Sequence, residues 1–283
     1  MRQSEKRTRK LTRGFYGIAF GATLLSLLIV RAEAQSADNF ATVVFAYDST
    51  GAPAGFTDPF TALGFPSRSA TITTPTYSMT EIVSVGNRGS ITLGFNRPIY
   101  HSAFNPGGYD FIIFGNSFYV NGNVHKRFQE PGLVEVGVDV NRNGVPDAGD
   151  IFYRLKGSPN PTYGFGGVDD RLSPTWGYAD VTPTNGVGDP RIASDPFTSG
   201  ISANSAGGDA FSLLWAIDSM GNPVTLARID FVRITSAGAG WSPEVDAISI
   251  VRPNHKGKIL HQNLLSRDAE GEVWKRKSGR GLR

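Results

Sequence analysis

Residues 133–155 read Leu-Val-Glu-Val-Gly-Val-Asp-Val-Asn-Arg-Asn-Gly-Val-Pro-Asp-Ala-Gly-Asp-Ile-Phe-Tyr-Arg-Leu, and they indicate both a fold class and a candidate site. From 134 to 140, a valine at every second position alternates with a polar or small residue. That period of two is the period of a β-strand. Residues 151–155 also have the composition of a strand. We therefore expect residues 139–150 to form a loop between two strands.

This loop has oxygen-bearing side chains at the spacing of a calcium loop. Ca²⁺ takes about six to eight oxygen ligands, and a twelve-residue loop supplies them from alternate side chains and one main-chain carbonyl. The sixth position, where such a loop turns sharply, is Gly144. The predicted calcium ligands are the side chains at positions 1, 3, 5, 9 and 12 and the carbonyl at position 7, namely Asp139, Asn141, Asn143, Asp147, Asp150 and Val145.

The spacing resembles EF-hand loops and, more closely, the calcium loops of dockerins, which also have Asp at position 12. Both families flank the loop with helices, whereas strands are expected here. The alternative is a plain hairpin turn, because Asn143-Gly144 is a strong hairpin signal and Asn and Asp suit turns. A plain hairpin does not require five oxygen donors at this spacing, so we favour a calcium site.

The first 34 residues have the features of a secretory signal peptide. A basic segment, residues 2–13, precedes an apolar run from Gly14 to Val30, and Ala32-Glu33-Ala34 is a small-x-small cleavage site. The alternative is a membrane anchor, but the run has 17 residues, at the lower limit for a spanning helix, and contains three glycines. We therefore expect export, cleavage after Ala34 and no transmembrane segment in the mature chain.

The basic charge lies at the two ends of the chain. Residues 1–34 contain seven Lys and Arg against two Asp and Glu, and residues 252–283 contain nine against three. Of 28 basic and 25 acidic residues in all, 12 and 20 remain in residues 35–251, a net charge of −8. This acidic body gives no indication of a nucleic-acid partner and fits an extracellular, cation-binding protein. The basic tail, 252–283, is expected to be disordered.

Between the two ends, short apolar segments alternate with Gly, Pro and Asn. The candidate strands are residues 42–47, 82–85, 90–95, 109–114, 133–140, 151–155, 211–217, 229–234 and 245–250. No segment of this region shows helical periodicity with caps. We therefore predict one all-β domain over residues 35–251, an antiparallel β-sandwich of the jelly-roll type. The chain has no cysteine, so its core and any bound metal must stabilise it.

A long segment, residues 157–209, interrupts the pattern of strands. It contains aromatic residues, which disordered segments lack, so we expect one long ordered loop over one end of the sandwich. Trp176 and Tyr178 are the candidate ligand-binding residues, because aromatic rings with polar edges suit sugars. The alternative is that these rings only anchor the loop. Asp169-Asp170 is either a second cation site or a solvated turn.

Residues 43–251 resemble a family of exported bacterial cell-surface proteins. The resemblance includes Tyr109-Asp-Phe-Ile-Ile-Phe-Gly-Asn-Ser-Phe118 and Thr175-Trp-Gly-Tyr-Ala-Asp-Val181, together with residues 89–95, 130–136, 207–211, 229–234 and 242–247. It implies a β-sandwich binding module and no particular activity. A hydrophobic sorting segment often follows in this family, whereas residues 252–283 are polar and basic.

Together these features predict a secreted, non-catalytic, calcium-binding module of the cell surface or extracellular matrix. Its expected partner is an extracellular glycan or a component of the cell envelope. The alternative is a secreted hydrolase of the glycosidase type, with Glu130, Glu135 or carboxylates of the long loop as acid and base. The sequence has no Gly-x-Ser-x-Gly or His-Glu-x-x-His motif, and its four histidines lack zinc-ligand spacing.

Overall fold

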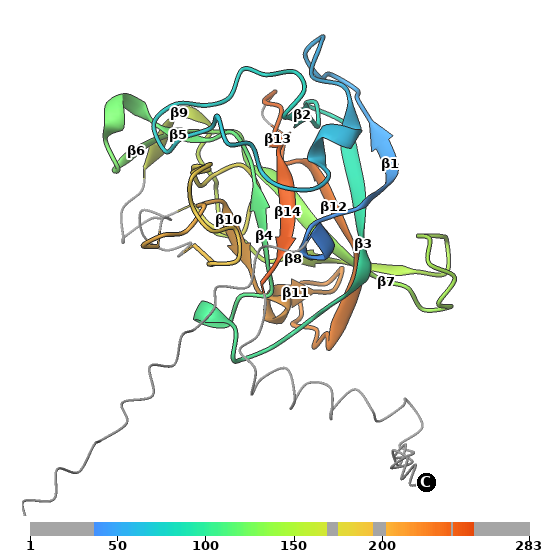
Figure 1. Ribbon diagram of the computed structural model, residues 1–283. Coiled ribbons are helices and arrows are strands. Elements are labelled where there is room, and N and C mark those ends of the chain that lie inside the picture. Colours follow the sequence, from blue (N-terminus) through green and yellow to red (C-terminus); the bar gives the residue numbers. More distant parts are fainter. Residues whose placement is uncertain (1–36, 169–174, 195–201, 239, 252–283) are drawn as a thin grey trace, which may run out of the picture. The chain divides into compact units, whose positions relative to one another are not determined.

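The protein, seen here in a computed structural model, is described over residues 37–168, 175–194, 202–238 and 240–251 (Figure 1). All of these residues belong to the unit Gln35–Arg283. The predicted signal peptide, the basic tail and Asp169-Asp170 lie outside the described residues. In the described part of the chain, helices are limited to five short 3₁₀ turns: η1 Ala37–Asn39, η2 Pro59–Ala62, η3 Pro106–Gly108, η4 Val120–Gly122 and η5 Leu213–Trp215. None of these helices is long and apolar enough to cross a membrane.

The larger sheet has six antiparallel strands in the order β1-β3-β12-β7-β8-β11. These strands are β1 Val43–Asp48, β3 Ser90–Tyr100, β12 Arg228–Ser236, β7 Gly132–Val138, β8 Ile151–Leu155 and β11 Ala216–Ile217. At its centre, Val232 of β12 lies opposite Leu93 of β3 and Val136 of β7. All three side chains are fully buried, so the alternating valines of the sequence form part of the core.

The smaller sheet is antiparallel and has the order β10-β4-β14. Its strands are β10 Asp209–Phe211, β4 Phe111–Phe114 and β14 Ala247–Ile250. Phe111 and Ile113 of β4 face the core that this sheet shares with the larger one, whereas Ile112 and Phe114 pack into a second cluster on the opposite face. The two packed sheets confirm the predicted all-β sandwich.

Described parts of the long segment 157–209 pack on the outer face of the smaller sheet. Ala193 and Ala206 from this segment pack with Ile112 and Phe114 in the second cluster. This placement explains why β4 is buried on both faces. The segment also contributes a strand, β9 Gly164–Val168, so it is not wholly a loop.

Two small sheets complete the fold. One sheet pairs β2 Val83–Ser84 with β13 Glu244–Val245, and the other joins β5 Phe118–Tyr119, β6 Lys126–Gln129 and β9. The prediction of one continuous strand over residues 211–217 is wrong. The Ser212 hydroxyl accepts the N–H of Leu214 and caps η5, so the chain leaves the smaller sheet at Phe211 and enters the larger one at Ala216.

Candidate metal centres

The loop 139–150 connects two paired strands of the larger sheet, as the sequence predicts. Val138 at the end of β7 lies opposite Ile151 at the start of β8. The loop therefore begins and ends at the same edge of the sheet, and it projects away from both sheets (Figure 1). An exposed loop on a rigid pair of strands is a suitable position for a binding site.

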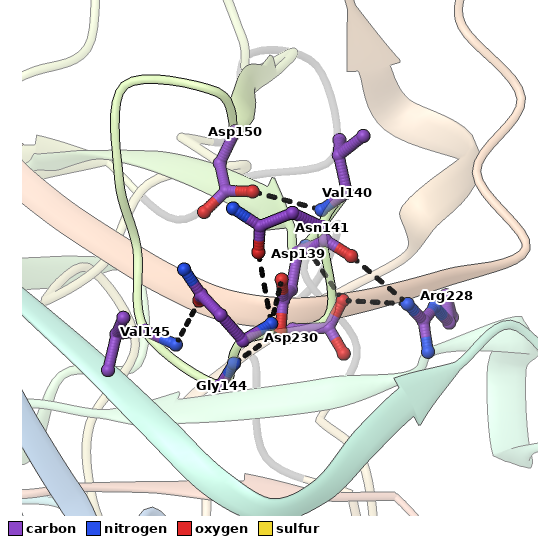
Figure 2. Close-up of polar contacts among 9 residues, drawn as sticks. Asp139, Val140, Asn141, Gly144, Val145, Asp150, Arg228 and Asp230 are labelled. Atoms are coloured by element: carbon purple, nitrogen blue, oxygen red, sulfur yellow. Dashed lines mark hydrogen bonds and ion pairs between the residues drawn. The ribbon is translucent and has the colours of Figure 1, made fainter.

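The first residue of this loop, Asp139, turns its carboxylate inward. Oδ1 accepts the main-chain N–H of Asn143 at 3.2 Å, and Oδ2 accepts that of Gly144 at 2.8 Å (Figure 2). Gly144 has φ +82°, a left-handed conformation that glycine adopts without steric cost. The sharp turn predicted at position 6 is therefore present. Asp139 stabilises this turn with a carboxylate that is nearly buried, since only 7% of the residue is exposed.

The remaining side chains of the loop form a single hydrogen-bonded network. Asp147 Oδ2 accepts the side-chain amides of Asn141 and Asn143, both at 2.7 Å. These bonds and the N–H of Gly149, which is the largest contribution, lower the pKa of Asp147. Asp150 closes the loop, since its Oδ2 accepts the N–H of Asp147 at 3.0 Å. The structure thus brings together all five predicted side-chain ligands.

Val145 contributes only main-chain atoms to this network. Its N–H donates to Asn143 Oδ1 at 2.9 Å, while its side chain is exposed (Figure 2). The asparagine oxygen is therefore fixed inside the loop. Because a carbonyl oxygen has two lone pairs, it can accept this bond and still coordinate a cation.

Asp230, on the central strand β12, was not predicted as part of this site. Its Oδ2 accepts the N–H of Asp139 at 2.9 Å and pairs with Arg228 at 3.6 Å (Figure 2). Burial is the main cause of its raised pKa, to which the charges of Asp139 and Asp150 add. In the sequence, Asp230 only alternates with apolar residues, as any strand residue can, and nothing links it to a loop 91 residues away.

A second group of acidic residues lies elsewhere in the structure. Carboxylate oxygens of Glu130, Asp180 and Glu244 all lie within 4.8 Å of one another, and we call these three residues the carboxylate cluster. Glu130 precedes β7, Asp180 follows the bridge that joins Ala179 to Gly132, and Glu244 begins β13. Three segments far apart in sequence therefore contribute one carboxylate each.

Main-chain donors hold the buried member of the cluster, Asp180. Its Oδ1 accepts the N–H groups of Asn116 and Ser117 at 2.7 and 2.8 Å, and its Oδ2 accepts that of Glu244 at 3.1 Å. Asp180 has a left-handed φ of +60°. A Cβ on Gly115 would lie 2.5 Å from Asp180 Oδ1, so glycine is required for this close approach.

The raised pKa values of the three carboxyl groups show that burial disfavours their charged forms. Burial is the largest cause of the raised pKa of each member, and it brings Glu130 to about 7. The charges of Glu130 and Glu244 raise the pKa of Asp180 further. Among the described residues, no ion pair connects the cluster to a basic side chain.

The cluster could hold a metal ion. A divalent cation would compensate charges that are otherwise costly to bury, and hard cations prefer oxygen ligands of this kind. The side-chain amide of Asn116, which donates to Glu244 at 2.9 Å, lies beside it. From the sequence, Glu130 was predicted only as a candidate acid, Asp180 was included only among the carboxylates of segment 157–209, and Glu244 was not predicted.

The proposed sugar-binding residues do not form an exposed pair. Tyr178 is 5% exposed, and its hydroxyl donates to the carbonyl of Ser158 at 2.8 Å. Trp176 is half-buried and packs edge-on against Trp215, with ring centroids 5.0 Å apart. Gly177 has φ +78°, so the backbone between the two rings is not an extended strand, in which both side chains would project to one face.

Glu135, the other candidate acid, lies on β7 and pairs with Arg233 of β12 at 3.5 Å. The guanidinium of Arg233 also lies 3.6 Å from the ring centroid of Phe152. These contacts give Glu135 a structural role on the outer face of the larger sheet.

No protein-family model matches this sequence, and the search of curated proteins found no match. The resemblance to exported cell-surface proteins therefore stays a prediction.

Proposed function

We propose that this protein is an exported, non-catalytic, calcium-binding module of the cell surface or extracellular matrix, and that the loop 139–150 binds the ion. The observation that carries the proposal is the convergence of the five ligand side chains in a network that turns at Gly144. The donors are carboxylate and amide oxygens, which suit Ca²⁺ rather than a softer metal.

Electrostatics supports a cation in this loop. Three aspartates, Asp139, Asp147 and Asp150, lie within twelve residues, with Asp230 behind the first of them. Among the described residues, Asp230 pairs with Arg228, and the loop itself contains Arg142. The four aspartates still exceed these two positive charges by two. Calcium would offset the repulsion among these carboxylates.

The carboxylate cluster supports a structural cation rather than acid–base catalysis. Both oxygens of Asp180 are occupied by main-chain N–H groups, and the residue is 2% exposed. A glycosidase needs two carboxyl groups that reach a substrate from opposite sides. Neither Asp180 nor Glu135, which is paired with Arg233, meets that requirement. Glu130 lies in the same cluster as Asp180 and does not line the pocket described below, so we prefer the non-catalytic function.

Isothermal titration calorimetry of the exported chain with CaCl₂, after removal of metal by EDTA, tests this proposal. We expect a saturable heat for wild type that falls in Asp139→Ala, because the loop's contribution is lost while any cation site at the carboxylate cluster remains. Asp218→Ala is a matched control, because Asp218 also accepts main-chain N–H groups in an exposed turn but stands outside the loop. Calcium binding that is unchanged in Asp139→Ala would move the site elsewhere, and absence of binding to wild type would overturn the proposal.

A further inference from the structure

A pocket of about 300 Å³ lies between the segment that follows β3 and the segment that contains η5. His101 and Tyr109 line it from the first segment, and Ser212, Leu214 and Trp215 from the second. Gly107, Gly108 and an alanine complete the wall. This volume lies at the lower end of the range for small-molecule sites, so the pocket suits one small ring rather than an extended ligand.

A buried carboxylate fixes the polar group of this pocket. His101 Nδ1 lies 3.0 Å from Asp110 Oδ2, and the Asp110 side chain is fully buried. Asp110 Oδ2 also accepts the N–H of Leu213 at 2.8 Å, while Oδ1 accepts that of Ser102 at 2.9 Å. Asp110 therefore links both walls of the pocket and orients the imidazole.

The other ring nitrogen of His101, Nε2, has no hydrogen-bond partner among the described residues. It can accept a hydrogen bond when the ring is neutral and donate one when the ring is protonated. A ligand hydroxyl satisfies both states, because it is both a donor and an acceptor. A carboxylate or an ammonium group satisfies only one of them.

The ring of Trp215 is held in place by packing against other aromatic rings. Trp215 packs edge-on against Tyr109, Trp176 and Phe211, with centroid distances of 6.0, 5.0 and 6.2 Å. A ring fixed in this way loses little conformational entropy when a ligand binds. Leu214 adds an apolar group at the pocket that is 57% exposed.

The charge of the pocket indicates a neutral ligand. None of the eight residues that line it is Lys, Arg, Asp or Glu. The one titratable group that can become positive, His101, is already paired with Asp110. A phosphate, carboxylate or ammonium compound would therefore find no matching charge, whereas a neutral polyhydroxylated ring finds an aromatic wall and a polar edge.

We propose that this pocket binds one pyranose ring of a saccharide, with the apolar face of the sugar against Trp215, its edge toward Tyr109 and a hydroxyl bonded to His101 Nε2. This site goes beyond the proposed calcium-binding function and is independent of it. It also differs from the predicted pair Trp176 and Tyr178. Trp176 packs against Trp215 and is a positioning residue in this arrangement.

Saturation-transfer NMR of the full chain tests the proposal with D-glucose, D-galactose, D-mannose and N-acetyl-D-glucosamine as probes. Sorbitol is the matched ligand control, because it has the hydroxyls but no ring face. We expect transfer to at least one sugar and none to sorbitol, with the same result in calcium and in EDTA. Failure of calcium binding would leave this outcome unchanged, so the two proposals can be separated.

Two variants locate the binding. His101→Asn keeps a donor toward Asp110, since its amide nitrogen takes the place of Nδ1, but removes Nε2. Leu214→Ala removes an exposed side chain whose loss the fold tolerates. Each is expected to weaken sugar binding by about tenfold, the factor for one good hydrogen bond or a comparable apolar contact. Phe104→Ala, in the same segment but outside the lining, should bind like wild type. If no sugar binds, or if both variants bind as wild type does, the proposal is wrong.

Discussion

Asp230 of the central strand β12 accepts the main-chain N–H of Asp139 at 2.9 Å, across 91 residues of sequence. The first predicted calcium ligand is thus fixed by the middle of the larger sheet and not only by its own loop. Arg228, which pairs with Asp230, also donates to the carbonyl of Asp139 at 3.3 Å. Changes in the charge of the loop should therefore affect the stability of the sheet.

Calcium is expected to raise the melting temperature through this connection. Extracellular modules bind calcium with dissociation constants of about 10⁻⁴ to 10⁻³ M. At a free concentration of about ten times that constant, the free energy of unfolding rises by about 1.4 kcal/mol. The melting temperature should then rise by about 3–6 °C, since each kcal/mol shifts a domain of this size by about 2–4 °C. Differential scanning calorimetry with calcium and with EDTA measures the difference.

In this measurement Asp139→Ala should lose the part of the calcium shift that comes from the loop and keep only what a cation at the carboxylate cluster contributes. Asp218→Ala should keep the full calcium shift, because its turn lies outside the loop. A calcium shift that is equal in Asp139→Ala and wild type would exclude loop 139–150 as the site.

Asp230→Asn is expected to weaken calcium binding without abolishing it. The amide oxygen can still accept the N–H of Asp139, but one negative charge behind the loop is lost. A charge interaction of about 0.5–1 kcal/mol corresponds to an affinity that is about two- to fivefold lower. Titration calorimetry at low and high salt checks the cause, because the difference from wild type should shrink as salt screens the charge. An affinity loss that is independent of salt would indicate a structural effect instead.

Much of the larger sheet could be predicted from the alternation of apolar residues. The segments 133–140 and 229–234 were predicted as strands and became β7 and β12, because one face of each is buried. The strand β6 was missed because Lys126-Arg-Phe-Gln129 has a charged start and no apolar alternation. Its Arg127 is 1% exposed, and burial of such a residue depends on partners from distant segments.

The local part of the candidate site was predictable, and the distant part was not. The spacing of residues 139–150 determines which side chains share the loop, so the sequence alone indicated that the five predicted ligand side chains lie together. The carboxylate cluster requires Glu130, Asp180 and Glu244 to meet, and sheet pairing over long separations decides that. The burial of Tyr178 could not be predicted for the same reason, because its hydroxyl bonds to the carbonyl of Ser158, 20 residues away in the sequence.

Tyr178→Phe is expected to lower the free energy of unfolding by about 0.5–1.5 kcal/mol. The substitution keeps the buried ring and removes the hydroxyl that bonds to the carbonyl of Ser158, and loss of a typical hydrogen bond costs about this much. Denaturation in urea measures the change. Tyr77→Phe is the control, since Tyr77 is 79% exposed and should lose almost nothing. Equal stabilities of Tyr178→Phe and wild type would show that this hydrogen bond contributes nothing.

The carboxylate cluster should make the free energy of unfolding depend on pH, and a bound cation should offset the loss of stability at high pH. Burial raises the pKa of Glu130 from 4.5 to about 7, so the folded protein holds a proton that the unfolded chain releases. The stability that comes from this proton is fully present below the unfolded pKa and is lost as pH rises through about 7. Asp209, whose pKa burial also raises to about 7, and His101, whose pKa is raised by Asp110, act with the same sign. In EDTA, the free energy of unfolding should therefore fall between about pH 5 and about pH 8.

Glu130→Gln separates the contribution of the cluster from those of Asp209 and His101. The amide can accept the N–H of Ser242 as Glu130 does, but it has no proton to lose, so the fall in stability should be smaller by up to about 3 kcal/mol.

If the cluster binds a divalent cation, adding calcium near pH 8 should stabilise wild type more than Glu130→Gln, because the ion replaces the missing protons at three carboxylates. Asp139→Ala, which lacks the loop site, should retain this difference. Urea denaturation of these three proteins across the pH range is the measurement, and identical pH profiles for wild type and Glu130→Gln would show that Glu130 already ionises normally in the folded protein.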